Sequence, residues 1–203
     1  MGKYIINGGK KLFGEVAIEG AKNSVLPILA ATVIGNKSNT IFNAPNLRDV
    51  DIMEKILLSI GCTVERMDNI IHVDSSTLNS IKIPEELVRE MRSSIILMGA
   101  MLSRCGEVII SYPGGCEIGP RPIDLHLKAL RELGVEIEES HGFLYCKNNG
   151  LKGCEIQLDY PSVGATENTI LAAVKADGVT IIRNAAREPE IIDLQNYLNK
   201  AGA

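Results

Sequence analysis

The stretches LLSIGCTVE at residues 57–65 and LRELGVEIE at residues 130–138 decide the fold of this chain. Each closes a helical pattern with a leucine four residues before a glycine, and then continues into alternating residues typical of a strand. A third copy, LNKAG at residues 198–202, follows near the end of the chain. The three glycines are 73 and 68 residues apart, and so regular a spacing indicates an internal structural repeat.

Each copy is preceded by further matching segments. Helices rich in Ala, Leu, Ile and Met, each ending near a glycine, are predicted at residues 21–34, 92–104 and 164–176. Because little of their surface is polar, we expect these helices to be buried. Strands are predicted at residues 4–6, 40–42, 108–110 and 179–182, and hairpins at residues 63–73 and 135–147.

The repeating unit is therefore strand, helix, strand, helix and hairpin, a βαβαββ-like order. It occurs at about residues 12–75, 84–148 and 154–203, and the third copy is incomplete because its hairpin is missing. The pattern predicts an α/β fold in which the helices pack against one another and the sheets lie outside.

Composition excludes several classes of protein. The net charge is −4 with no basic stripe and no tryptophan, so nucleic-acid binding is not expected. The longest apolar run, residues 94–102, is about half of the ~20 residues that a membrane span needs, and no signal peptide is visible. The five cysteines form no CxxC pair and no cluster has metal-ligand spacing. We therefore expect a cytoplasmic protein with free thiols, and neither a metal ion nor a membrane partner.

The middle repeat carries four or five extra residues, which form the loop PGGCEIGPRP at residues 113–122. Gly114 and Gly119 have the spacing of a phosphate-binding loop, but the required Lys-Ser/Thr pair does not follow, and no dinucleotide fingerprint is present. Cys116 lies between glycines and near Arg121, which favours a reactive thiol. The simpler alternative is a turn whose cysteine is incidental.

This loop, extended to His126, resembles the catalytic loop of the UDP-N-acetylglucosamine 1-carboxyvinyltransferases. Three more segments agree in the same order along the chain: residues 20–23, 162–166 and 184–190. The resemblance implies an inside-out α/β barrel of the enolpyruvyl transferase type. It also implies transfer of the enolpyruvyl group of phosphoenolpyruvate to the 3′-hydroxyl of UDP-N-acetylglucosamine, with release of phosphate. This is the first committed step of peptidoglycan synthesis, and it needs no cofactor because phosphoenolpyruvate is a substrate.

The same resemblance assigns roles to individual residues. Cys116 is implied to be the general acid, to form a covalent adduct with phosphoenolpyruvate, and to be the target of fosfomycin. Residues implied to bind the substrates are Lys22, Asn23, Arg92, Arg121, Pro122, Ile123, Asp124, Leu125, Ser162, Val163 and Gly164. The simpler alternatives are an N-cap role for Asn23 and for Ser162. Roles at the site remain open for Asp49, Asp51, His126, Glu188 and Glu190.

Members of this family have two similar domains with the active site between them. Residues 1–20 are therefore expected to join a second domain that this chain lacks, while residues 21–203 form the catalytic-loop domain. By this reasoning the chain alone is inactive. Two alternatives stay open: the related enolpyruvyl transferase of the shikimate pathway, and a non-catalytic fragment that only binds ligand.

Overall fold

The computed structural model describes residues 3–114 and 123–203. In the first repeat, two helices alternate with the strands of a three-stranded antiparallel sheet of order β1-β3-β2. Its elements are α1 (Lys22–Ala31), β1 (Ser38–Ile41), α2 (Arg48–Ser59), β2 (Thr63–Met67) and β3 (Ile70–Asp74). The register places Ile41 and Arg66 on either side of Ile71, so the hairpin predicted at residues 63–73 is confirmed.

The second repeat has the same order, with an additional short helix at its start. Its elements are α3 (Glu85–Glu90), the 3₁₀ helix η1 (Arg92–Ile96), α4 (Leu97–Cys105), β4 (Glu107–Ser111), α5 (Asp124–Glu132), β5 (Val135–Ser140) and β6 (Phe143–Asn148). The antiparallel sheet order is β4-β6-β5, which confirms the second hairpin. Lys82 adds a parallel bridge to Ile109 on the free edge of β4.

The third repeat consists of β7 (Glu155–Gln157), α6 (Val163–Ala173), β8 (Ile181–Arg183) and α7 (Pro189–Ala201). Here β7 and β8 pair in parallel, as Lys82 and Ile109 do in the second repeat. The equivalence of these pairs shows that one folding unit is used again.

The glycines that mark the repeat have the conformation that the sequence indicated. Gly61, Gly134 and Gly202 follow α2, α5 and α7 with φ of 98°, 94° and 101°, a left-handed backbone that glycine adopts without steric cost. The glycines after the other helices behave differently. Gly106 does cap α4, but α1 ends at Ala31 and α6 at Ala173, short of Gly35 and Gly178.

The predicted helices 21–34 and 164–176 are therefore too long by about three residues at their C-terminal ends. In both places the chain continues in turns closed by bonds from residue i to residue i−3, such as Ile34 N–H to Ala31 O and Ala176 N–H to Ala173 O. Such tight turns keep Val33 and Ile34 buried, and Val174 and Ala176 partly buried, without extending the α-helix.

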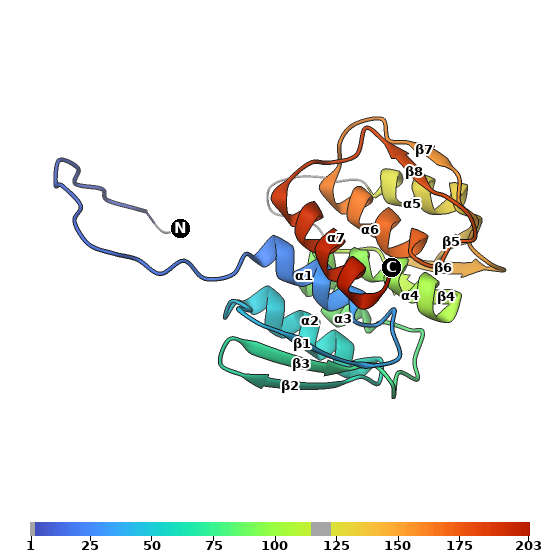
Figure 1. The fold of residues 1–203 in the computed structure, drawn as a ribbon, viewed down its shortest axis with the longest axis horizontal. Helices are drawn as coiled ribbons and strands as arrows, with labels where there is room; N and C mark the ends of the chain where they lie inside the picture. Colours follow the sequence, from blue (N-terminus) through green and yellow to red (C-terminus); the bar gives the residue numbers. More distant parts are fainter. Residues whose placement is uncertain (1–2, 115–122) are drawn as a thin grey trace.

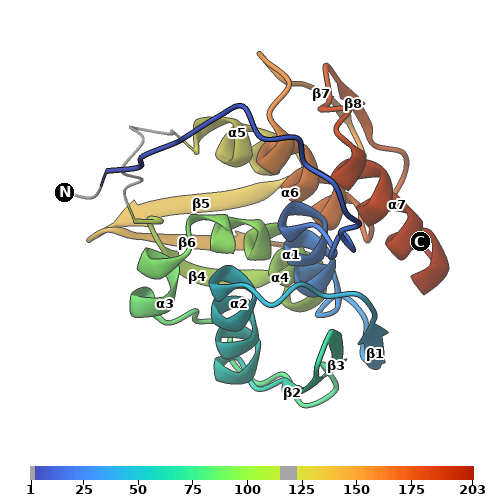
Figure 2. The same ribbon diagram turned by 90° about the vertical axis from the view of Figure 1, so that its left-hand side faces the viewer.

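The helices α1, α4 and α6 form the interior of the molecule. Residues 97–102 of α4 are all buried, and so is most of α1 and α6. In both views these helices lie between the β1-β3-β2 sheet and the β7-β8 pair (Figures 1 and 2). Gly99 allows α4 to cross α6 closely, because a Cβ at this position would lie 2.2 Å from the backbone oxygen of Asn168. The expectation that these helices are buried is confirmed.

Residues 3–20 extend away from the rest of the molecule (Figure 1). They form neither helix nor strand, and their large apolar side chains are almost fully exposed, with Tyr4 at 97% and Leu12 at 98%. The strand predicted at residues 4–6 is wrong for this structure. A strand needs a hydrogen-bonded neighbour, and none of the described strands lies beside this segment.

Candidate functional site at the helix N-termini

Three predicted binding residues lie at equivalent places in the three repeats. Lys22 begins α1, Arg92 begins η1, and Ser162 is the N-cap of α6. The first N–H groups of a helix have no partner within it, and the helix dipole favours negative charge there. The arrangement therefore presents two cationic side chains and a helix N-terminus, which suits the binding of anions.

Ser162 combines two roles at the start of α6. Its Oγ accepts a hydrogen bond from the Ala165 N–H at 3.3 Å, so the simpler interpretation as a helix cap is confirmed. Within the described residues, the N–H groups of Val163 and Gly164 have no acceptor. The cap thus leaves two backbone donors at this end of α6 available to a ligand.

Lys22 forms an ion pair with Asp49 across two helices of the first repeat. Lys22 Nζ lies 2.8 Å from Asp49 Oδ2, and both side chains are partly exposed. Asp49 is thus near the candidate site, whereas Asp51 pairs with Arg66 on the neighbouring hairpin. The ion pair holds the ammonium group of Lys22 at the N-terminus of α1, where a second anion can approach it.

Asn23 does not cap α1, because the N-cap is Ala21 and Asn23 lies within the helix. The alternative interpretation of Asn23 as an N-cap is therefore wrong. Its side-chain amide instead donates to Glu190 Oε1 of α7 at 3.5 Å, a long contact that links the first and third repeats. Glu190 is thereby placed beside Asn23, a residue predicted to bind phosphoenolpyruvate.

Glu167 is a candidate residue that the sequence analysis missed. It lies on α6 with only 3% of its surface exposed, and it faces Glu188 and Glu190 at the start of α7. Burial, strengthened by these two carboxylates, raises the pKa of Glu167 to about 8. The available signal was that Glu167 is the one charged residue of the segment 163–173.

His126 brings the second and third repeats together. It is 8% exposed, and burial together with the nearby positive charge of Arg92 lowers its pKa to about 4. Its ring lies against Gly164, where an added Cβ would be 3.1 Å from the histidine Cε1. His126, Arg92 and the N-terminus of α6 thus form one cluster, although they are far apart in the sequence.

The remaining predicted residues belong to the loop and to the start of α5. Cys116, Arg121 and Pro122 lie outside the described residues. Ile123 and Leu125 are buried at 6% and 2% exposure, while Asp124 is exposed in the first turn of α5. The roles of Ile123, Asp124 and Leu125 in binding stay predictions.

The other four cysteines are free thiols, and burial raises the pKa of each of them. The pKa rises to about 11 for Cys62 and to about 12 for Cys146, and it also rises for Cys105 and Cys154. Buried thiols of high pKa carry little thiolate at neutral pH and react slowly. These four are therefore poor candidates for chemistry.

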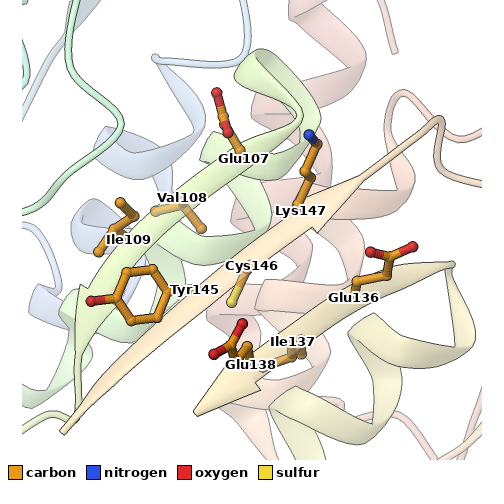
Figure 3. Close-up of a pocket in the computed structure, with 9 residues that line it drawn as sticks. All are labelled: Glu107, Val108, Ile109, Glu136, Ile137, Glu138, Tyr145, Cys146 and Lys147. Atoms are coloured by element: carbon orange, nitrogen blue, oxygen red, sulfur yellow. The ribbon is translucent and has the colours of Figure 1, made fainter. Parts of the chain in front are cut away.

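A hollow of about 390 Å³ lies on the β4-β6-β5 sheet and contains none of the predicted residues (Figure 3). Glu107, Glu136 and Glu138 line it, with Lys147 as the one basic lining residue. This surplus of negative charge opposes the binding of phosphate compounds. The hollow is consequently not the candidate site.

No three His, Cys, Asp or Glu side chains within residues 3–114 and 123–203 are grouped so that they could hold a metal ion. In the same ranges, none of the helices has both the length and the apolar character needed to cross a membrane.

Comparison with known proteins identifies the family. Residues 6–203 match the family described as EPSP synthase (3-phosphoshikimate 1-carboxyvinyltransferase). The chain belongs to the EPSP synthase family.

Solved structures have the same fold as this chain. The enolpyruvyl transferase NikO from Streptomyces tendae superposes with a TM-score of 0.84 over 97% of this chain and 46% of its own, at 23% identity. EPSP synthase from Acinetobacter baumannii gives 0.67 over 87% of this chain and 41% of its own, at 18% identity.

Within the EPSP synthase family, the sequence relatives are much more similar to this chain than those structures are. UDP-N-acetylglucosamine 1-carboxyvinyltransferase 2 of Caldanaerobacter subterraneus subsp. tengcongensis is 59% identical over the whole chain and 49% of its own length. UDP-N-acetylglucosamine 1-carboxyvinyltransferase 1 of Clostridium acetobutylicum is 54% identical, again over the whole chain and 49% of its own length. The chain spans about half the length of these relatives.

Proposed function

We propose that this chain is part of an enzyme that transfers the enolpyruvyl group of phosphoenolpyruvate to the 3′-hydroxyl of UDP-N-acetylglucosamine, the first committed step of peptidoglycan synthesis. The observation that carries the proposal is the 59% identity, over every residue of the chain, to a relative of that name. The anion-binding character of the helix N-termini supports it, since both substrates are phosphate compounds. The reaction uses no cofactor and takes place in the cytoplasm.

The proposed roles follow from the positions of the residues. Lys22 holds the phosphate of phosphoenolpyruvate as a point charge at the start of α1, and Asn23 beside it donates a hydrogen bond. Arg92 and the N-terminus of α6, with Ser162, Val163 and Gly164, receive the nucleotide sugar. We assign Arg121, Pro122, Ile123, Asp124 and Leu125 to the same ligand.

Cys116 is proposed as the general acid towards phosphoenolpyruvate and as the site of a covalent adduct with it. A nearby cation favours the thiolate form of a cysteine, and Arg121 follows Cys116 by five residues in the sequence. The same reactivity makes Cys116 the proposed target of fosfomycin. No other cysteine competes for this role, because burial raises the pKa of Cys62, Cys105, Cys146 and Cys154.

We further propose that residues 21–203 form an inside-out α/β barrel domain and that residues 1–20 pair with a second domain. The exposed apolar side chains of residues 3–20 support this, because such a series of side chains is stable only when another surface covers it. With half of the site contributed by that domain, the 203-residue chain alone does not turn over substrate.

The test is phosphate release from phosphoenolpyruvate by the longest protein that contains this sequence. Release should require UDP-N-acetylglucosamine and should not occur with shikimate 3-phosphate. The 203-residue chain serves as the comparison and should release no phosphate. If phosphate is released with shikimate 3-phosphate and not with UDP-N-acetylglucosamine, the protein belongs to the shikimate pathway. If no phosphate is released with either acceptor, the protein only binds ligand.

A further inference from the structure

His126 of α5 and Asn168 of α6 form a buried polar contact for which the proposed reaction gives no role. Asn168 is completely buried, and its Nδ2 lies 3.1 Å from His126 Nδ1. Within the described part of the chain, the other ring nitrogen of His126, Nε2, has no hydrogen-bond partner. A histidine that is more than nine-tenths buried takes its protonation state from the few groups that contact its two ring nitrogens.

Two backbone groups determine the orientation of the Asn168 amide. Its Oδ1 accepts from the N–H of Gly99 at 2.6 Å, and its Nδ2 donates to the carbonyl oxygen of Ile95 at 3.0 Å. An N–H can only donate and a carbonyl can only accept, so the amide cannot be turned round. The nitrogen end of Asn168 must therefore face the histidine.

This orientation sets the protonation state of His126. One hydrogen of Asn168 Nδ2 is bound to Ile95, and the other points to His126 Nδ1. Nδ1 must then accept with its lone pair, which leaves the proton of the neutral imidazole on Nε2. The low pKa of His126, caused by burial and by Arg92 of η1 against the opposing effect of Asp124, agrees with a neutral ring at pH 7.

The Nε2 edge of the ring lies at the N-terminus of α6. A Cβ added to Gly164 would be 3.1 Å from His126 Cε1 and 3.3 Å from His126 Nε2. Glycine at this position thus leaves the ring edge uncovered. Beside it are the N–H groups of Val163 and Gly164, for which the described residues supply no acceptor. Three donors gather in one place and share no acceptor among the described residues.

We propose that Asn168 is a positioning residue that holds His126 as a neutral Nε2–H donor, and that this donor binds the diphosphate of a nucleotide sugar together with the N–H groups of Val163 and Gly164. The identity of the ligand rests on the proposed function. The tautomer of His126 follows from the protein alone. The two parts can therefore be tested separately.

The first test is nitrogen-15 NMR of the histidine side chains in the unsubstituted 203-residue chain, with His126→Gln to assign the signal. We expect a protonated Nε2 and an unprotonated Nδ1 at pH 7, and the same state down to about pH 5. A protonated Nδ1, or a doubly protonated ring at pH 7, would overturn the inference. This measurement does not depend on the folding of any Asn168 variant.

The second test compares Asn168→Asp with Asn148→Asp in the binding of UDP-N-acetylglucosamine, followed by NMR titration. Asn148 is a matched control, because its Nδ2 donates to two carbonyls, those of Leu102 and Gly106, and its Oδ1 accepts from the Gly150 N–H. Both variants lose the same kind of backbone contact. Only Asn168→Asp replaces the donor that faces His126 Nδ1 by a carboxylate oxygen, which favours a proton on Nδ1.

We expect Asn168→Asp to bind the nucleotide sugar roughly tenfold more weakly than Asn148→Asp, the loss typical of one hydrogen bond to a charged group. The His126 Nε2 signal of the unsubstituted chain should also move when UDP-N-acetylglucosamine is added, and should not move with N-acetylglucosamine, which has no diphosphate. Equal binding by the two variants would overturn this inference and leave the proposed function intact. An unsubstituted chain that binds no UDP-N-acetylglucosamine would overturn the ligand half of the inference, while the tautomer is still decided by the first test. The proposed function is decided separately, by phosphate release from the longest protein that contains this sequence.

Discussion

Replacing Glu167 by glutamine should remove much of the pH dependence of stability between pH 6.5 and 8. Glu167 has a pKa of about 8 in the folded chain and an ordinary value of 4.5, because it is buried opposite Glu188 and Glu190. Between these two values the folded state holds a proton that the unfolded state has released. Stability therefore falls as the pH rises, until the folded carboxyl also ionises near pH 8.

The magnitude follows from the size of the shift. Each pH unit in this range costs about 1.4 kcal/mol, so Glu167 should lower the free energy of unfolding by about 2 kcal/mol from pH 6.5 to pH 8. Burial on α6 allows little screening by solvent, since only 3% of Glu167 is exposed. A loss of this size is a substantial part of the total stability of a typical domain.

Urea unfolding followed by circular dichroism at several pH values measures the effect. The pH range ends at 8 because the buried cysteines begin to contribute above it, as their thiols ionise in the unfolded chain. Glu86→Gln is the control, since Glu86 is exposed on α3 and should leave the slope unchanged. If Glu167→Gln and the unsubstituted chain lose stability equally over this range, the reasoning about burial and like charge is wrong.

Three more outcomes are expected. In the unsubstituted chain, His126 should lower the free energy of unfolding by about 3 kcal/mol as the pH falls from 6.5 to 4, because the unfolded histidine takes up a proton in this range and the folded one, with its pKa near 4, does not. His126→Gln should abolish this loss. Urea unfolding at acid pH measures the effect, and an unchanged slope of stability against pH would contradict the prediction. Gly99→Ala should destabilise the fold by about 2 kcal/mol or more, since its Cβ would meet the backbone of α6. Gly35→Ala is the control, because the space around Gly35 is open and its stability should change little. Equal thermal unfolding of the two variants would refute the close crossing of α4 and α6 at Gly99. Fosfomycin should add to Cys116 alone, as judged by peptide mass spectrometry, and labelling at any of the other four cysteines instead would contradict that assignment.

Much of the fold could be predicted from the sequence. The recurring glycines at residues 61, 134 and 202 marked the ends of three helices, since left-handed backbone after a helix strongly favours glycine. The two hairpins and the buried helices were also predictable. The absence of a strand at residues 4–6 was not, because the apolar side chains of Tyr4, Ile5 and Ile6 carry no information on whether a partner strand is present.

The candidate site was only partly predictable. Lys22, Arg92 and Ser162 could be placed at helix starts from the local pattern, and the structure confirms those positions. The resemblance to the family assigned no role to Glu167 or Asn168, which lie buried within α6. Their properties depend on Glu188, Glu190, Gly99 and His126, which lie between 21 and 69 residues away along the chain.

The sequence by itself determined the repeat, the helix and hairpin positions, and the family, since each of these is encoded by spacings of a few residues. Only the tertiary structure decided that Glu167 is buried against two carboxylates, that His126 is held by Asn168 against Gly164, and that Lys22 meets Asp49. The physical reason is that burial and hydrogen-bond geometry set the charge state of a side chain, and both arise only when distant segments pack together.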